Sequence, residues 1–201
     1  MISIGNDIVS LNLTDTRRTR LPQFYNKILN AVEIEQHQRC VLPFEQYVWL
    51  LWSIKEAVYK CAKRHNTTLL FSPKKIIVQN ITGVQGGAEV TCAATCNRVT
   101  YYGKSYVYDQ VIHSIATNQT PSRLDSIHWG LQFIGDDCNE NQSAQVRELT
   151  RDAVSNMFGA ASISFTSADA GYPQLVINNT ISELPLSFSH HGNYVAYALY
   201  L

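Results

Sequence analysis

A carboxylate and an ammonium group stand one helical turn apart in the first third of the sequence. Residues 52–60 read Trp-Ser-Ile-Lys-Glu-Ala-Val-Tyr-Lys, and a helix here places Trp52, Glu56 and Lys60 above one another on a single stripe. The spacing alone leaves two interpretations open. Such a pair is often only a weak surface ion pair contributing about 0.3 kcal/mol, or it belongs to a functional site, and the surrounding motifs must decide between them.

The helix that carries this pair is predicted from a run of apolar residues between two stop signals. Pro43 precedes the run and the polar stretch 63–66 follows it. The apolar residues are Val48, Leu50, Leu51, Trp52, Ile54, Ala57 and Val58. We therefore expect a mostly buried helix that presents Glu56 and Lys60 from one side.

Three further short stretches accompany this helix. They are Gly5-Asn6-Asp7 near the N-terminus, and Gly171-Tyr172-Pro173 and Ser187-Phe188-Ser189-His190-His191-Gly192 near the C-terminus. Together with W-x-x-K-E-A-x-x-K, they resemble the G-x-D, G-x-P and S-x-S-H motifs of the 4'-phosphopantetheinyl transferases, in the order of the holo-acyl-carrier-protein-synthase branch. Each match is short, but four in this order make a specific signal. Residues 81–158 carry no such motif.

The resemblance implies an enzyme of fatty acid or polyketide biosynthesis. It would transfer the 4'-phosphopantetheine arm of coenzyme A to a serine of an apo acyl or peptidyl carrier protein and release adenosine 3',5'-bisphosphate. The serine hydroxyl attacks the β-phosphorus, so the site needs cations for the pyrophosphate and a base for the hydroxyl. Two alternatives stay open: a non-catalytic module of the same fold that binds a carrier protein or coenzyme A, and an α+β protein whose motif matches are accidental.

The resemblance also implies roles for individual residues. Asp7 and Glu56 are expected to hold Mg²⁺, which binds one or two protein carboxylates together with substrate phosphates. Without the other motifs, Asp7 at a strand end would more often be a turn-former. Glu56, or a water that it holds, is the expected base, and Lys60 the cation that stabilises the phosphate oxygens.

Coenzyme A is expected to contact residues of three motifs. These residues are Lys55, Lys60, Gly171, Pro173, Ser189 and His190. Lys55 lies about a hundred degrees round the helix from Glu56, so its role would be a supporting one. A lone histidine near a chain end is more often a surface residue, and only the S-x-S-H setting favours a role for His190; none is expected for His191.

The chain departs from the family pattern at three places. The fused branch of the family carries a second acidic residue two positions after the Asp, where this chain has Val9, so the metal would have two carboxylate ligands and waters. Residues 62–66 lack the glycines that many members have after the helix, which leaves the loop conformation open. The middle of G-x-P is commonly Lys or Arg and here is Tyr172; an aromatic ring can stack on adenine, but a phosphate contact is lost.

A basic cluster opens the predicted helical region at 13–38. It consists of Arg17, Arg18, Arg20 and Lys27. The family's partner proteins are acidic helical bundles, so the cluster resembles a docking face that attracts the carrier protein by complementary charge. The alternative is an ordinary solvated helix start.

The composition is that of an ordinary globular protein of 201 residues, 45% of them hydrophobic. Lys and Arg total 16, as do Asp and Glu, so the net charge gives no support for a nucleic acid or an anionic membrane as partner. Five cysteines without C-x-x-C spacing, one of them Cys138, argue against a disulfide framework and a structural zinc site. No targeting run or apolar stretch of about 20 residues is found, and we expect a cytoplasmic protein.

The element pattern predicts an α+β fold made of two similarly built halves, 1–120 and 121–201, each with antiparallel strands packed against helices. Strands are expected at 1–9, 74–79, 88–118 (two or three, with turns at Asn97 and Gly103), 128–134, 163–165, 174–177 and 187–201. Helices are expected at 13–38 (broken at Pro22), at the apolar run 48–58 between Pro43 and the polar stretch 63–66, and at 144–158. The chain has the length of fused family members, which resemble a pseudo-dimer, but the motif order of the single-unit members, which form trimers. A monomeric pseudo-dimer is the expectation.

Overall fold

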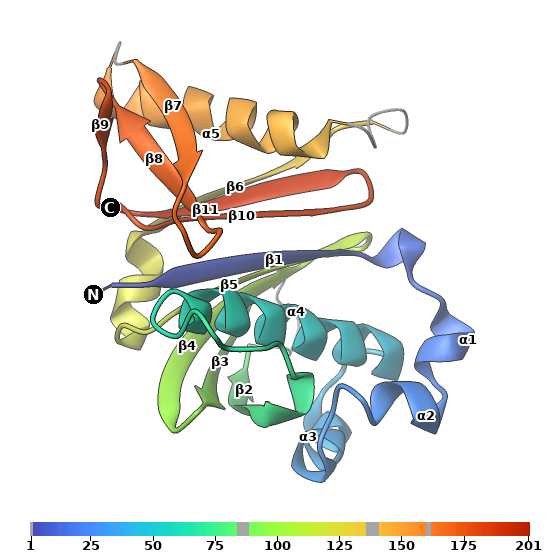
Figure 1. The fold of residues 1–201 in the computed structure, drawn as a ribbon. Coiled ribbons are helices and arrows are strands. Elements are labelled where there is room, and N and C mark those ends of the chain that lie inside the picture. The colour runs from blue at the N-terminus through green and yellow to red at the C-terminus, as the bar shows by residue number, and fades with distance from the viewer. Residues whose placement is uncertain (1, 84–88, 136–140, 160–161) are drawn as a thin grey trace.

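The computed structural model describes residues 2–83, 89–135, 141–159 and 162–201, and it is an α+β protein (Figure 1). The strands are β1 (Ile4–Ser10), β2 (Ile76–Thr82), β3 (Glu89–Cys96), β4 (Val99–Val107), β5 (Val111–Thr117), β6 (Ile127–Phe133), β7 (Ile163–Ser167), β8 (Pro173–Ile177), β9 (Thr180–Ile181), β10 (Leu186–His191) and β11 (Tyr194–Tyr200). The helices are α1 (Thr16–Thr19), α2 (Pro22–Tyr25), α3 (Ala31–Gln36), α4 (Phe44–Lys63) and α5 (Gln142–Phe158), with 3-10 segments at Leu11–Leu13, His37–Arg39, Pro73–Lys75 and Pro121–Ser126.

Both halves follow the same order of elements, in which one strand is followed by a long helix and then by antiparallel strands. The first half forms one sheet in the order β1-β5-β4-β3-β2, and the second half forms two smaller sheets, β10-β11-β6 and β7-β8-β9. Starting from β6, the strand order β6-β11-β10 of the second half matches β1-β5-β4 of the first, and the remaining strands of the second half form the separate sheet β7-β8-β9 (Figure 1). The predicted fold of two similarly built halves is therefore confirmed. The proposed boundary at residue 120 falls in the connection between β5 and β6 and stays a prediction.

Helix α4 forms the core of the first half, as its apolar run predicts. Its side chains Tyr47, Leu50, Leu51 and Ile54 are fully buried or nearly so, and the helix packs across β1 and β5. Burying each such side chain stabilises the fold by roughly 1.5–3 kcal/mol. This packing fixes the helix against the strand that carries Asp7.

Gly5 lets strand β1 approach helix α4 more closely than any other residue would. A Cβ atom at this position would overlap the carbonyl oxygen of Ala57 and lie 2.7 Å from the backbone nitrogen of Cys61. Alternate residues of a strand share a face, so Asp7 faces α4 together with Gly5. Ile4 and Ile8 face the other way, toward apolar residues of the second half.

The two halves meet along the free edge of β1, which lies beside β10 (Figure 1). An unpaired strand edge needs other hydrogen-bond partners, and side chains of β10 supply them here. The backbone nitrogen of Asn6 donates to Ser187 Oγ (3.0 Å), and that of Ser10 donates to His191 Nδ1 (2.8 Å). Asn6 Nδ2 donates to Ser189 Oγ (2.8 Å). The S-x-S-H stretch therefore lies in a strand that joins the halves, within the region 187–201 where a strand was expected.

Several other expectations need correction. Region 13–38 forms the short helices α1, α2 and α3, because Pro22 begins α2 and the Asn30 side chain caps α3. Gly103 lies inside β4, where a Cβ would come within 2.9 Å of Cys92 Sγ, so this glycine marks a close contact and no turn. The final strand at 187–201 is two strands joined at Gly192, and β1 begins at Ile4.

Each half has a core of its own, and smaller apolar clusters lie between them. One cluster contains Ile4, Ile115 and Ala198, and another contains Ile8, Val111 and Ala196. In the described ranges, the cysteines Cys40, Cys61, Cys92 and Cys96 are free thiols; Cys138 and most of the expected loop 135–142 lie outside them. None of the helices in those ranges has the length and apolar character needed to span a membrane.

Candidate active site

Asp7, Glu56 and Lys60 meet where strand β1 crosses helix α4. Lys60 Nζ lies 3.1 Å from Asp7 Oδ1 and donates to the backbone oxygen of Asn6 at 2.9 Å. The second carboxylate oxygen, Asp7 Oδ2, is buried and has no hydrogen-bond partner among the described residues. Asp7 was expected at the end of its strand, but it lies in the interior of β1. The adjacent helix, rather than a turn, provides its surroundings.

Burial raises the pKa values of both carboxyl groups. Burial raises the pKa of Asp7, against the opposing effect of Lys60. Burial and the charge of Asp7 raise the pKa of Glu56 to about 7, and Lys60 again opposes the shift. A single ammonium group thus only partly compensates two neighbouring carboxylates.

The carboxylate pair fits a hard divalent cation. Magnesium binds oxygen ligands and usually takes one or two protein carboxylates, with waters and substrate phosphates in its other positions. The unpartnered Asp7 Oδ2 is available as such a ligand. In the described parts of the chain, no three or more His, Cys, Asp and Glu side chains group in a way that could hold a metal.

Both histidines of the S-x-S-H stretch lie near this centre, in different settings. His190 is exposed, but neighbouring groups partly desolvate its ring, and this partial desolvation and the charge of Lys60 lower its pKa. His191 faces β1, where Nδ1 accepts the backbone N–H of Ser10 at 2.8 Å. Burial lowers the pKa of His191, while Asp7 opposes that shift. His191, for which no role was expected, is therefore part of the join between the halves.

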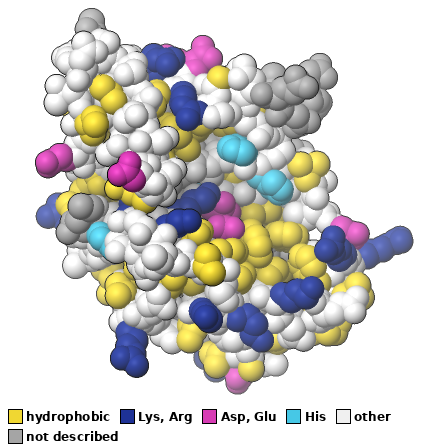
Figure 2. Space-filling model, viewed as in Figure 1, with side chains coloured by type: hydrophobic (Ala, Val, Ile, Leu, Met, Phe, Trp, Pro, Cys, Tyr) yellow, Lys and Arg dark blue, Asp and Glu magenta, His cyan; other side chains and the backbone are white. Residues whose placement is uncertain are grey.

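A cationic pocket opens beside Lys60, between the C-terminal end of α4 and the second half. It has a volume of about 210 Å³. Its lining residues are Lys60, Lys63, Arg64, Ala170, Gly171, Tyr172, Pro173, Ser187 and Phe188. Figure 2 shows Lys and Arg side chains beside Asp and Glu side chains across the middle of this face, between the halves. The pocket therefore continues from the carboxylate pair toward positive charge, as a phosphate ligand requires.

The G-x-P stretch forms the opposite wall of this pocket. Gly171 lies in the tight connection between β7 and β8, with φ of +83°, a conformation that favours glycine. Its backbone nitrogen donates to the carbonyl oxygen of Ala168 at 2.8 Å. Gly171 and Pro173, both expected at a coenzyme A site, thus face Lys60 across the pocket.

The S-x-S residues are arranged differently from the expectation. Ser189 is 4% exposed, and its hydroxyl accepts from the Asn6 side chain, so it lies between the halves. Ser187, two residues earlier, lines the pocket instead. The sequence also gave no role to Lys63, Arg64 and Phe188. Arg64 follows Glu56 and Lys60 at intervals of four residues, and that spacing was a signal that could have identified it.

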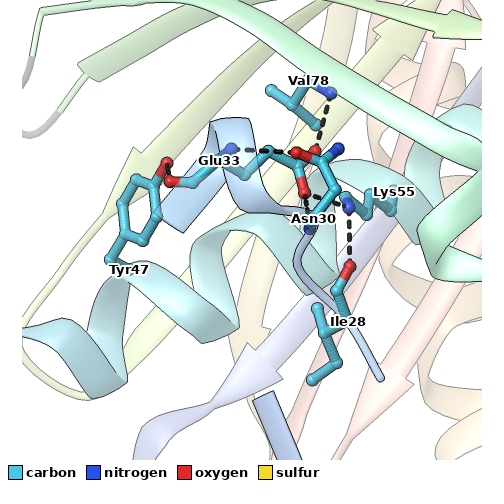
Figure 3. A network of polar contacts seen from close by, with 6 residues as sticks. All are labelled: Ile28, Asn30, Glu33, Tyr47, Lys55 and Val78. Atoms are coloured by element: carbon cyan, nitrogen blue, oxygen red, sulfur yellow. Dashed lines mark hydrogen bonds and ion pairs between the residues drawn. The ribbon is translucent and has the colours of Figure 1, made fainter. Parts of the chain in front are cut away.

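Lys55 lies in the interior of the first half and does not line the pocket (Figure 3). Its Nζ is 2.7 Å from Glu33 Oε2 and donates to the carbonyl oxygen of Ile28 at 2.7 Å; the Lys55 and Glu33 side chains are both 0% exposed. Glu33 also accepts the backbone N–H of Val78 (2.9 Å) and forms a reciprocal cap with Asn30. Lys55 therefore ties α3 and β2 to α4, because a side chain about a hundred degrees from Glu56 points into the core.

The basic cluster lies on the exposed segment before α4. Arg17, Arg18 and Lys27 are exposed, and the described carboxylates include no ion-pair partner for them. Arg20 differs, because it forms two hydrogen bonds with Glu45 at 3.1 and 3.0 Å. Three of the four expected docking residues thus carry uncompensated charge.

The fold and the site define an α+β protein of two joined halves, with a carboxylate pair beside a cationic pocket. The family model described as the 4'-phosphopantetheinyl transferase superfamily matches residues 3–116. The match covers more than half of the chain, and the protein belongs to this superfamily. Phosphopantetheinyl transfer, with coenzyme A as substrate and typically a divalent metal, is the activity of the family. No curated protein matches the chain significantly.

Proposed function

We propose that this protein transfers the 4'-phosphopantetheine arm of coenzyme A to a serine of an apo acyl or peptidyl carrier protein and releases adenosine 3',5'-bisphosphate. The observation that carries the proposal is the meeting of Asp7, Glu56 and Lys60 at the mouth of a cationic pocket. Attack of a hydroxyl on a phosphorus atom needs a base and fixed positive charge at the phosphate oxygens. The site provides both within neighbouring turns of one helix.

Each residue of the centre has a role in this proposal. Asp7 and Glu56 would hold Mg²⁺, which when bound supplies positive charge to the pyrophosphate. Glu56, or a water that it holds, would accept the proton of the serine hydroxyl. Lys60 holds Asp7 in place and presents a cation to the phosphate oxygens. Ser187 lines the pocket from the second half, and the exposed His190 stays a candidate contact for the phosphates of coenzyme A.

Helix α4 also suggests an orientation for the two substrates. The basic cluster is tied to the first turn of α4 through Arg20 and Glu45, whereas the cationic pocket lies at the last turn. A carrier protein docked on Arg17, Arg18 and Lys27 would approach the Glu56 region from one end, and coenzyme A from the other. Because residues of both halves line one pocket, a single chain is sufficient for the site, and we propose that the protein acts as a monomer.

Incubation of the purified protein with magnesium, coenzyme A and a set of apo carrier proteins tests the function. We expect one or more carriers to gain the mass of one phosphopantetheine arm. If coenzyme A binds but no carrier gains mass, the result would contradict the proposal and support a binding module. Size-exclusion chromatography with light scattering checks the monomeric state; an obligate trimer would contradict it.

A further inference from the structure

The stripe of α4 that carries Glu56 and Lys60 extends by one more turn to Arg64. Arg64 is the C-cap residue of α4 and keeps right-handed helical backbone angles, with φ of −63° and ψ of −27°. Residues four apart lie on the same helix face, and four residues rise about 6 Å. Arg64 therefore lies one step beyond Lys60, on the side away from Glu56.

In the part of the chain that the structure describes, the charges of Arg64 and Lys63 have no carboxylate partner. Among the carboxylates in the described ranges, none lies within ion-pair distance of either residue. Both side chains are nevertheless half-buried, and burial lowers the pKa of Arg64. A cation that is partly removed from water and lacks a counter-charge is costly unless an anion binds to it.

The guanidinium group of Arg64 is held in one orientation from two sides. It donates to the carbonyl oxygen of Leu186, and its central carbon lies 4.3 Å from the centre of the Tyr172 ring. Such stacking fixes the plane of the donor fork without consuming its charge. Tyr172 replaces the cation common at the middle of G-x-P, and Arg64 brings positive charge to the same spot from the other wall.

Arg64 also separates two pockets. On one side lies the cationic pocket with Lys60 and Lys63, whose described lining residues include no acidic side chain. On the other side lies a wider pocket of about 640 Å³, which Tyr172, Pro185 and Tyr200 help to line. A ligand that runs along the α4 stripe would thus meet Lys60 first, then Arg64, and then a roomier space that Glu183 also helps to line.

We propose that Arg64, assisted by Lys63, binds the 3'-phosphate of coenzyme A and makes the enzyme discriminate against donors that lack it. The inference rests on the proposed function, because it places the pyrophosphate at Lys60. In coenzyme A a ribose separates the pyrophosphate from the 3'-phosphate, which matches cations one helical turn apart. A planar guanidinium fork recognises a phosphate monoester through paired charge-assisted hydrogen bonds. The adenine would then lie toward the wider pocket.

Isothermal titration of coenzyme A and 3'-dephospho-coenzyme A tests the proposal. The parent should bind coenzyme A at least about tenfold more tightly than the dephospho form, since hydrogen bonds to charged groups contribute about that much. Arg64→Gln should bring the two affinities close together without weakening the dephospho form. Arg151→Gln is the matched control, because Arg151 also stacks on an aromatic ring, that of Phe165, but lines neither pocket.

The outcomes separate this proposal from the proposed function. The dephospho form retains the arm and the pyrophosphate, so arm transfer from it by the parent tests the chemistry independently of the 3'-phosphate. If the parent binds both donors equally, the inference is overturned even when transfer proceeds. The same holds if Arg64→Gln keeps the full discrimination. If Arg64→Gln fails to fold, two other measurements still test the proposal. Lys63→Gln should reduce the discrimination in part, and the parent should bind coenzyme A more tightly than the dephospho form.

Discussion

Lys60 donates to Asp7 across the contact of α4 with β1, with Nζ 3.1 Å from Oδ1, while Asp7 Oδ2 is buried and has no partner in the described ranges. One carboxylate therefore has one oxygen neutralised by the protein and the other left for a ligand. Gly5 makes this contact possible, since any side chain there would push β1 away from the helix. The G-x-D motif thus combines two roles on one strand face. The glycine allows the close packing, and the aspartate two residues later provides the carboxylate.

We expect Glu56→Gln to fold normally but to lose at least about a hundredfold in kcat, because it removes the base and a metal ligand at constant volume. The measurement is the rate of mass gain on the carrier protein at saturating magnesium. Glu35→Gln, an exposed glutamate on α3, is the control and should retain parental activity. Parental turnover by Glu56→Gln would remove Glu56 from the centre.

We expect Asp7→Asn to lower the pKa of Glu56, because the charge of Asp7 helps to raise it. The variant should also need more magnesium for half-maximal rate, and part of its lost activity should return as magnesium is increased. Titration of rate against magnesium, and NMR titration of the Glu56 carboxyl group, provide the two readouts. An unchanged magnesium requirement would contradict a ligand role for Asp7.

The metal-free protein should lose stability as the pH rises through the range in which Glu56 ionises. The pKa of Glu56 is about 7 when folded and near its usual 4.5 when unfolded, so the folded state binds more protons between these values. The contribution of the protonated Glu56 carboxyl group to the free energy of unfolding is complete below about pH 4.5 and disappears as the pH rises through about 7. Stabilisation by magnesium should grow over the same range, because the ligands must be ionised.

Thermal melts with and without magnesium, at several pH values between about 5 and 8, measure this effect. The difference between the parent and Glu56→Gln isolates the carboxyl group, because the lowered pKa values of His190 and His191 affect both proteins equally. A pH dependence that is identical in the two proteins would contradict the assignment.

Breaking the buried pair of Lys55 and Glu33 should destabilise the first half by about 3–5 kcal/mol, because it leaves an uncompensated buried charge. Lys55→Met should show this loss in chemical denaturation, and adding Glu33→Gln should recover part of it. The KM for coenzyme A of the folded fraction should stay at the parental value. A raised KM with parental stability would instead indicate that Lys55 contacts the substrate.

Replacing Arg17 and Arg18 by Glu should raise the KM for the carrier protein, leave coenzyme A binding unchanged and flatten the salt dependence of kcat/KM. Exposed charges act mainly on association and are screened within about 8 Å at physiological salt. Arg123→Glu, an exposed charge change between β5 and β6, is the control. A loss of coenzyme A affinity at an unchanged carrier KM would assign the cluster to the nucleotide.

Much of the fold follows from local patterns in the sequence. The apolar run between Pro43 and residues 63–66 determines α4, and alternation with turn residues determines most strands, since these signals depend only on neighbours in the chain. Gly103 and region 13–38 were misjudged for the opposite reason. Gly103 is required by the approach of Cys92 from a neighbouring strand, and short helices at 13–38 depend on what they pack against.

The sequence by itself determined which residue types form the centre, because Glu56 and Lys60 are one turn apart and Asp7 shares the strand face of Gly5. Only the tertiary structure decided which of the remaining candidates join them. Ser189 and His191 bind β1 and connect the two halves, and Lys55 pairs with Glu33 in the core. Arg64 lines the pocket together with Tyr172. These assignments depend on the packing of α4, β1 and β10, and β1 and β10 are more than a hundred residues apart in the sequence. Local spacing carries no information on which face of a strand or helix such a distant neighbour will cover.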